Sequence, residues 1–272
     1  MTYDWVPSNG GEVGGVDIVQ RERQTTDLVA SAISGRAAGR TLQSQVLHKL
    51  GVMIVSGAIA PGDILPADAE LLERFDVSRT VLREALKALA AKNMVEARAG
   101  VGTRVRDRRH WSLFDPDVLA WHFEAGPDID FLRSLAEIRV GIELESTALA
   151  AMRRSPEQID HMFVCVDGMQ QARRTEDFAR HDLAFHRTVA EASGNLFMAS
   201  ISGLVDMALA SAFTMSSPVD EPVAHETTVA HHRRVAQAVH DRDADAARAA
   251  MRIVIAEGFE RAAGRMSGEA WS

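Results

Sequence analysis

Apolar residues from Leu42 onward recur every three or four positions, which is the spacing that places them on one side of an α-helix. The first of these stretches stops at Gly57 and a following Pro-Gly turn. A second begins at Asp68, which can cap a helix, and a third begins at Ser78 after a short turn. The pattern therefore predicts three helices, of which the last two are joined by a tight turn.

A different pattern follows the third helix, where short strands are predicted around Val95 and from Thr103 to Val105. These two stretches flank a turn that contains Gly100. Three helices followed by a two-stranded hairpin form a winged helix-turn-helix, in which the N-terminal part of the third helix enters the major groove of DNA. We expect Gly100 to let the wing backbone approach phosphates or the minor groove.

The third helix, SRTVLREALKAL at residues 78–89, carries cations on its polar side. Arg79 and Arg83 begin a row of positive charges that recurs every four residues. On an isolated helix such a row usually serves solubility, but in a winged domain an arginine at this place can pair with guanine O6 and N7. We therefore expect Arg79 and Arg83 to read bases. Ser78 and Thr80, at the helix N-terminus, suit phosphate oxygens.

Charge is distributed unevenly along the chain, whose formal net charge is -8. Residues 41–110 hold 11 Lys and Arg against 8 Asp and Glu, whereas residues 111–272 hold 15 against 25. A cationic segment beside an acidic one is expected of a polyanion-binding module joined to a second domain. The single Cys165, the lack of a long apolar run and the polar, glycine-rich start lead us to expect a cytoplasmic protein without a membrane span.

The segment from Gly57 to Val105 resembles the DNA-binding domain of GntR-type bacterial regulators through PGDILP, AELLERFDVSRTVLREALKAL and GVGTRV. The resemblance gives the same roles to the third helix: two base-reading arginines, two phosphate contacts at its start, and Gly100 at the wing tip. Ala67, Asp68 and Ala69 depart from the residues usual in the family. We therefore expect the affinity or the operator sequence to differ.

Beyond the stretch LFDPDVLAW at residues 113–121, the pattern predicts about six consecutive helices with an apolar interior. The predicted fold class is mainly α: a winged helix-turn-helix with a small β-hairpin, followed by an all-α bundle. The predicted segments are a flexible tail at 1–40, the winged domain at 41–108, a linker at 109–129, an effector-binding and dimerisation domain at 130–266 and a short tail at 267–272.

Within the predicted bundle, Asp182 and His186 stand four residues apart and so share one face of a helix, and His232 follows about two helices later. Such a pair is often only a hydrogen bond, although it can also aim a carboxylate and an imidazole at one cation. Residues 132–263 resemble the effector domain of the FadR subgroup through EIRVGIELESTALAA, DLAFHRTVAEASGN and HRRVAQAVHDRDADAARAAM. That resemblance implies a divalent metal, zinc or similar, held by one Asp and three His.

Asp182, His186 and His232 match three of those four ligands, and Val254 stands in place of the fourth. Two outcomes stay open. One is a weaker site made of the three remaining ligands, and the other is a metal-free pocket in which the same groups hydrogen-bond an effector directly.

The resemblance also assigns effector contacts to Arg139 and Asn195. Arg139 has a simpler interpretation as a surface ion pair with Glu143 one turn away, and Asn195 as a helix N-cap after Gly194. The linker resembles that of regulators that respond to sugar acids such as gluconate or galactonate. It can equally start a helix whose Trp121 packs against the bundle.

These patterns predict a DNA-binding regulator and no enzyme: a homodimer on a palindromic operator, most simply a repressor released by a small carboxylate effector. Two alternatives follow from the same residues. The Asp182, His186 and His232 set is also typical of non-haem metal-dependent enzymes. The second alternative is a dimeric DNA-binding protein without a ligand.

Overall fold

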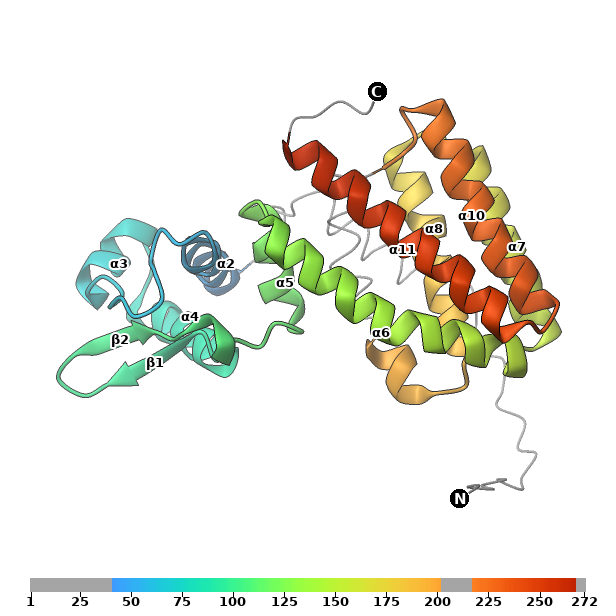
Figure 1. Ribbon diagram of the computed structural model, residues 1–272. Helices are drawn as coiled ribbons and strands as arrows, with labels where there is room; N and C mark the ends of the chain where they lie inside the picture. The colour runs from blue at the N-terminus through green and yellow to red at the C-terminus, as the bar shows by residue number, and fades with distance from the viewer. Residues whose placement is uncertain (1–40, 202–216, 268–272) are drawn as a thin grey trace, which may run out of the picture.

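The computed structural model describes residues 41–201 and 217–267, so the predicted tail at 1–40 and residues 268–272 lie outside the described residues. The N-terminal part consists of two helices, a recognition helix and a hairpin (Figure 1). These elements are α2 (Leu42–Val55), α3 (Asp68–Phe75), α4 (Arg79–Ala91), β1 (Val95–Arg98) and β2 (Gly102–Val105). The predicted winged helix-turn-helix is confirmed.

Local capping explains where these helices begin. The side chain of Ser78 accepts a hydrogen bond from the backbone N–H of Val81, as predicted for the N-cap of α4. Asp68 is not a cap: it is the first residue of α3, and the N-cap is Ala67, whose side chain offers no hydrogen bond. Asp76, in a left-handed conformation with φ of 50°, makes the tight turn from α3 toward α4.

The wing is an antiparallel hairpin in which Val95 pairs with Val105 and Arg98 with Gly102. The positive φ of Gly100, 73°, allows the turn at its tip. Ile64, from the loop after α2, forms a bridge with Arg104 on the free side of β2. This bridge ties the wing to the helices.

The predicted linker contains the short 3-10 helix η1 (Arg108–His110) and the helix α5 (Pro116–Glu124). Trp121 is buried in the core of the winged domain and lies against Gly51 of α2. The interpretation that packed Trp121 against the bundle is therefore wrong. Leu119 and Phe123 project from α5 into a small cluster with residues of α6 and α11.

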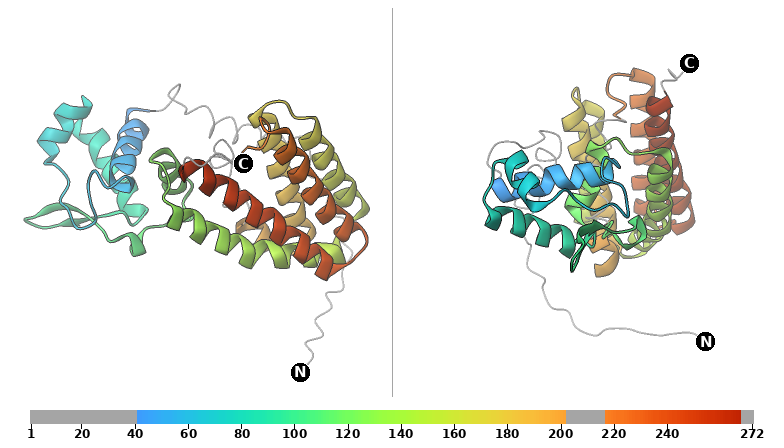
Figure 2. Two further views of the ribbon diagram at one scale, coloured as in Figure 1. Left: turned by 45° about the horizontal axis from the view of Figure 1, so that its top comes forward. Right: turned by 90° about the vertical axis from the view of Figure 1, so that its left-hand side faces the viewer.

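The C-terminal part is all helical, as predicted. Its elements are α6 (Ile129–Arg153), α7 (Pro156–Gln171), α8 (Thr175–Ala192), α10 (Pro222–His240) and α11 (Ala244–Ser267). The long helices α6 and α11 run side by side in opposite directions, while α7 pairs with α8 and α10 lies between α7 and α11 (Figures 1 and 2). In the part of the chain that the structure describes, no helix is long and apolar enough to cross a membrane.

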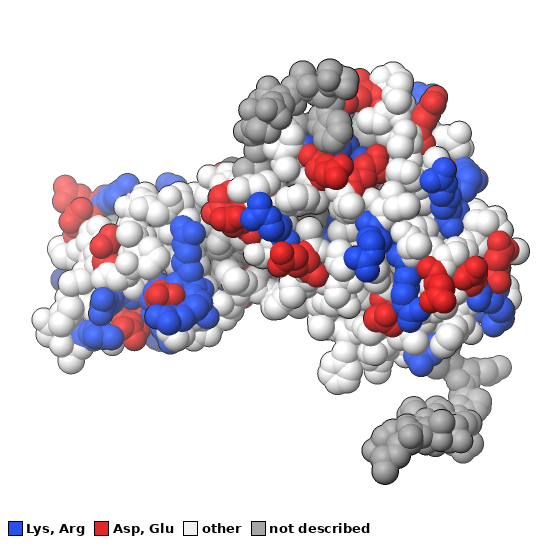
Figure 3. Space-filling view, in the orientation of Figure 1, with Lys and Arg blue, Asp and Glu red and all other residues white. Residues whose placement is uncertain are grey.

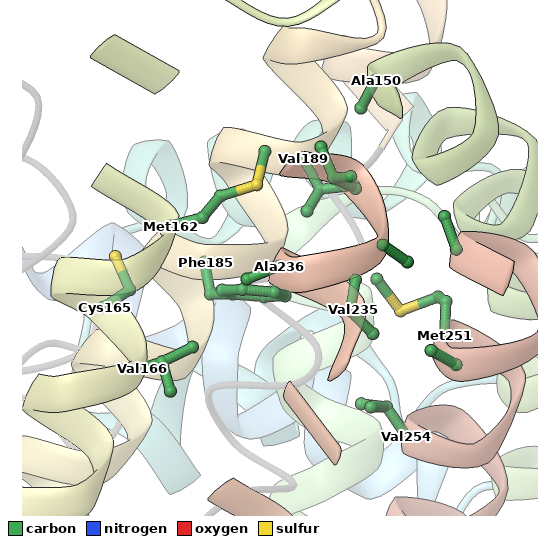
Figure 4. Packing of buried hydrophobic residues seen from close by; sticks show 14 of the residues in the cluster. Ala150, Met162, Cys165, Val166, Phe185, Val189, Val235, Ala236, Met251 and Val254 are labelled. Carbon is green, nitrogen blue, oxygen red and sulfur yellow. The ribbon is translucent and has the colours of Figure 1, made fainter. Parts of the chain in front are cut away.

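A core of valine, alanine, methionine and phenylalanine side chains fills the bundle. Phe185 is fully buried on α8, and Val235 and Met251 come from α10 and α11 (Figure 4). Because α8 and α10 both contribute to this core, packing fixes the position of every polar side chain that the two helices turn inward.

Candidate functional site

The start of α4 presents its polar side chains to solvent. Ser78, Arg79, Thr80 and Arg83 are all exposed, and the nearest carboxylate to Arg83 is that of Glu84, 3.8 Å away. An exposed pair at this distance holds the guanidinium only weakly. Arg79 and Arg83 are therefore available for an outside partner, whereas the Ser78 hydroxyl already accepts the Val81 N–H.

A concave surface connects α4 with the wing. One hollow is lined by Arg79, Thr80 and Arg83, and a second by Gly102 and Thr103 of the wing; the two hollows share Asp68 and Leu86. Gly100 is exposed at the hairpin turn. This is the arrangement that a winged domain uses to place a helix in the major groove and a hairpin beside it.

In the bundle, three side chains that the sequence suggested as metal ligands lie together. Asp182 and His186 of α8 and His232 of α10 are buried, and one ligand atom from each lies within 4.8 Å of the others. His186 and His232, which are 46 positions apart in the sequence, therefore lie together as predicted. Asp182 Oδ1 lies 2.8 Å from His232 Nε2 and 3.9 Å from His186 Nε2.

The hydrogen bonds of His232 define which nitrogen faces Asp182. Nδ1 lies 2.8 Å from the carbonyl oxygen of Thr228, so Nδ1 carries the proton and donates it there. In a neutral ring, Nε2 then presents a lone pair to the carboxylate of Asp182. Two lone pairs 2.8 Å apart repel unless a proton or a metal cation lies between or beside them.

Buried polar atoms without hydrogen bonds mark the same place. Among the described residues, Asp182 Oδ2, His186 Nδ1 and His232 Nε2 are buried and have no partner of hydrogen-bond geometry. His186 Nδ1 faces Glu143, so Nε2 is the ring nitrogen on the side of Asp182. The two histidines and one carboxylate form a donor set that fits a divalent cation.

The simpler of the two interpretations of Arg139, a surface ion pair with Glu143, is wrong about the surface: the pair forms, but it is buried beside His186. Glu143 Oε1 accepts a hydrogen bond of 2.5 Å from Arg139 Nε, and Glu143 Oε2 lies 2.7 Å from His186 Nδ1. Both partners of the ion pair are buried, with only 8 and 9% of their side chains exposed. The i, i+4 spacing predicted the ion pair. The pattern of charges along the sequence did not reveal that the pair lies on the buried face of α6.

Two carboxylates in this cluster stay ionised despite burial. Burial alone would raise the pKa of Glu143, but the Arg139 guanidinium and His186 hold that pKa well below its ordinary value. Burial likewise opposes ionisation of Asp182, and His232 with His186 lowers its pKa overall. These directions favour the anionic form of both carboxylates, as the ion pair of Glu143 with Arg139 and a metal-ligand role for Asp182 require.

Val254 takes no part in this polar cluster. It is buried in the apolar core beside Val235 and Met251 (Figure 4) and has no ligand atom. Asn195 acts as the N-cap of the helix that begins at residue 196, since its Oδ1 accepts the backbone N–H groups of Phe197 and Met198. Its contact with an effector stays a prediction.

Both domains of the chain match known protein families. Residues 42–105 match the model of bacterial regulatory proteins of the gntR family, and residues 134–257 match the FCD domain. The uncharacterized HTH-type transcriptional regulator YieP of Escherichia coli is 32% identical over 214 residues, which are 78% of this chain and 91% of YieP.

Two further relatives are repressors. The galactonate operon transcriptional repressor of Escherichia coli is 28% identical over 80% of this chain and 95% of its own. The repressor NanR of Klebsiella aerogenes is 29% identical over 82% of this chain and 86% of its own.

Among solved structures, Lar, which controls the expression of the Listeria monocytogenes agr system, shares the fold. It superposes with a TM-score of 0.57 at 19% identity, over 83% of this chain and 98% of Lar. Because the sequence similarity to YieP extends over both domains, the chain belongs to the GntR family of bacterial DNA-binding transcription regulators.

Proposed function

We propose that this regulator is a homodimeric repressor that leaves a palindromic operator when a small carboxylate, such as a sugar acid, binds its helical domain. The observation that carries the proposal is the buried cluster of Arg139, Glu143, Asp182, His186 and His232, which is polar, partly unsatisfied and enclosed by an apolar core. Similarity to the galactonate operon repressor supports a sugar acid as the effector class.

Charge inside the cluster favours an anion once a metal is present. Arg139 contributes one positive charge, and Glu143 and Asp182 one negative charge each, so the cluster with neutral histidines carries a net charge of -1. A divalent cation changes this sum to +1. Because an isolated charge is costly to bury, a monoanionic carboxylate would complete the site.

Asp182, His186 and His232 would hold the cation, which would supply a positive centre for the effector carboxylate. Glu143 would orient both Arg139 and His186, since it lies against each of them. Hydroxyl groups of a sugar acid would find partners among buried polar groups that otherwise lack them.

Release from DNA would follow from a coupling free energy between the two sites. An effector that prefers one arrangement of the helical domain shifts the dimer toward winged-domain positions that no longer match both half-sites. We propose no enzymatic activity, because the relatives are transcription regulators, and we place the protein in the cytoplasm, where its DNA lies.

The test is thermal unfolding of the full chain against a panel of sugar acids and other small carboxylates, with and without EDTA. A ligand at about a hundredfold excess over its Kd stabilises the folded state by about 2.7 kcal/mol. A shift that EDTA abolishes supports the metal-bound version, and a shift that persists supports a metal-free pocket. A sugar acid that shifts the midpoint but leaves operator affinity unchanged contradicts the regulatory role, and the absence of any shift contradicts the effector class.

A further inference from the structure

The outer face of the wing hairpin carries arginines from both strands. Pairing of Glu96 with Arg104 and of Arg98 with Gly102 puts Glu96, Arg98 and Arg104 on one face of the hairpin. Val95 and Val105 lie on the opposite face and are buried in the core of the winged domain. Packing therefore does not account for the arginines.

These arginines surround a shallow hollow at the base of the wing. We call Arg98, Arg104, Arg106 and Arg109 the wing patch; they line the hollow together with His110, Pro61, Gly62, Glu96, Val105 and Asp107. Four guanidinium groups face two carboxylates. Figure 3 shows Lys and Arg side chains gathered over the hairpin and its base, at the left of the molecule.

Only half of the wing patch is neutralised by neighbouring acids. Arg98 pairs with Glu96 and Arg109 with Asp107. In contrast, Arg104 donates to the carbonyl oxygen of Gly62 at 3.0 Å, and no ion pair links it to a carboxylate of the described residues.

Arg106 likewise donates to a neutral acceptor, Asn93 Oδ1, at 3.0 Å, and has no carboxylate partner within the described ranges. A neutral acceptor fixes a guanidinium in place without cancelling its charge. The wing patch therefore holds two fixed, uncompensated cations, which suits a polyanion better than a single small anion.

The wing patch continues the DNA-binding surface around the edge of the hairpin. Arg98 lines the hollow of the wing patch. It also lines the hollow on the other face of the hairpin, together with Gly102 and Thr103 of the wing and Leu86 of α4. A hairpin that enters the minor groove has a sugar-phosphate backbone on each side, and one of these backbones lies away from the recognition helix.

We propose that the wing patch binds the DNA backbone on that outer side of the wing. Its contacts are to phosphates, so they position the domain and add affinity without reading sequence. The contact extends the DNA footprint beyond the bases that α4 reaches. It also explains why the only cationic segment of an acidic chain continues past α4 into the hairpin and η1.

The test uses the full-length double variant Arg104→Gln/Arg106→Gln, which removes the two uncompensated cations, and a labelled mixed-sequence duplex of about 40 base pairs, because phosphate contacts are independent of sequence. Affinity is measured by fluorescence anisotropy across a salt series. The slope of log K against log salt is negative, and each lost phosphate contact reduces its magnitude by about 0.9. We therefore expect a slope that is shallower by about 2 per protomer, and at least tenfold weaker binding at low salt.

Two controls separate this role from folding and from net charge. Glu96→Gln removes an acid from the same face and should strengthen binding, which a damaged fold cannot do. Arg133→Gln/Arg174→Gln removes two exposed arginines from the helical domain and should leave the slope unchanged. A wild-type slope in the wing double variant overturns the proposal, as does an equal loss in the Arg133 and Arg174 control.

Discussion

The ring of Trp121 in α5 lies directly against the backbone of α2 at Gly51, where a methyl group would overlap the ring. The same helix is fixed to the winged domain by ion pairs of Lys92 with Asp115 and Asp117 and by the contact of His48 with Glu124. On its other side, α5 packs against α6 and α11 through an apolar cluster and through the ring of His122, which stacks on Phe131. We therefore infer that α5 moves with the winged domain, and that a change in the bundle reaches DNA through the apolar side of α5.

Gly51→Ala should destabilise the winged domain. Because the new methyl group overlaps Trp121, the helix must shift, and overpacking of this kind costs about 1 to 3 kcal/mol. Urea unfolding measures the loss. Gly141→Ala is the matched control: Gly141 is also helical, but its missing Cβ meets nothing within 4 Å, so alanine there should be neutral or stabilise by up to about 1 kcal/mol. Equal stabilities of the two variants would contradict the close contact.

His186→Ala should lower the metal content of protein purified without chelator. The substitution removes one of three ligands that lie within 4.8 Å of one another, and two ligands hold a divalent cation poorly. Elemental analysis gives the metal-to-protein ratio. His240→Ala, at a histidine with 55% of its side chain exposed, should keep the wild-type ratio. The metal-bound site is excluded if neither the wild type nor His240→Ala contains metal.

Val254→His should make stability depend on metal. Without metal, the variant buries an imidazole in an apolar cluster and should lose about 1 to 3 kcal/mol. The family resemblance puts the fourth metal ligand at this position, so zinc should restore the stability of the variant or raise it above the wild type, because metal binding adds to the free energy of folding. Thermal unfolding with zinc and with EDTA separates the two states. A zinc effect no larger than in the wild type would mean that position 254 does not reach the cluster.

Acid should weaken the fold partly through Glu143. Its pKa is lowered in the folded protein, so its contribution to stability is present above the unfolded value of about 4.3 and is lost as pH falls through and below that value. Glu143→Gln should therefore cost about 1.5 to 3 kcal/mol at neutral pH, with a smaller difference from wild type near about pH 3.5. Urea unfolding at both pH values measures it, and a constant difference would argue against the ionised pair.

The fold and much of the site were predictable from local pattern. Residue spacing and caps such as Ser78 defined the helices, and the glycine turn defined the wing. Burial was harder to predict: Glu143 looks like any acidic residue on a helix surface, and only the packing of α6 against α8 encloses it beside His186. The position of Trp121 was predicted wrongly for a related reason. A helix between two domains presents apolar residues to both, and the sequence does not indicate which residue packs against which domain.

Arg83→Ala provides the most direct test of base reading. Arg83 is exposed at the concave surface of α4 and has only a weak pair with Glu84, so its removal should leave the unfolding midpoint unchanged. If it pairs with a guanine, operator affinity should fall by about 1 to 3 kcal/mol per half-site and discrimination at one base pair should be lost. Lys87→Ala, one turn further along α4 and paired with Glu84, should change affinity much less. The measurement is selection of operators from random DNA with the wild type and each variant. Operators selected by Arg83→Ala should lose the base preference at one position. If their base preferences match those of the wild type, Arg79 alone reads bases.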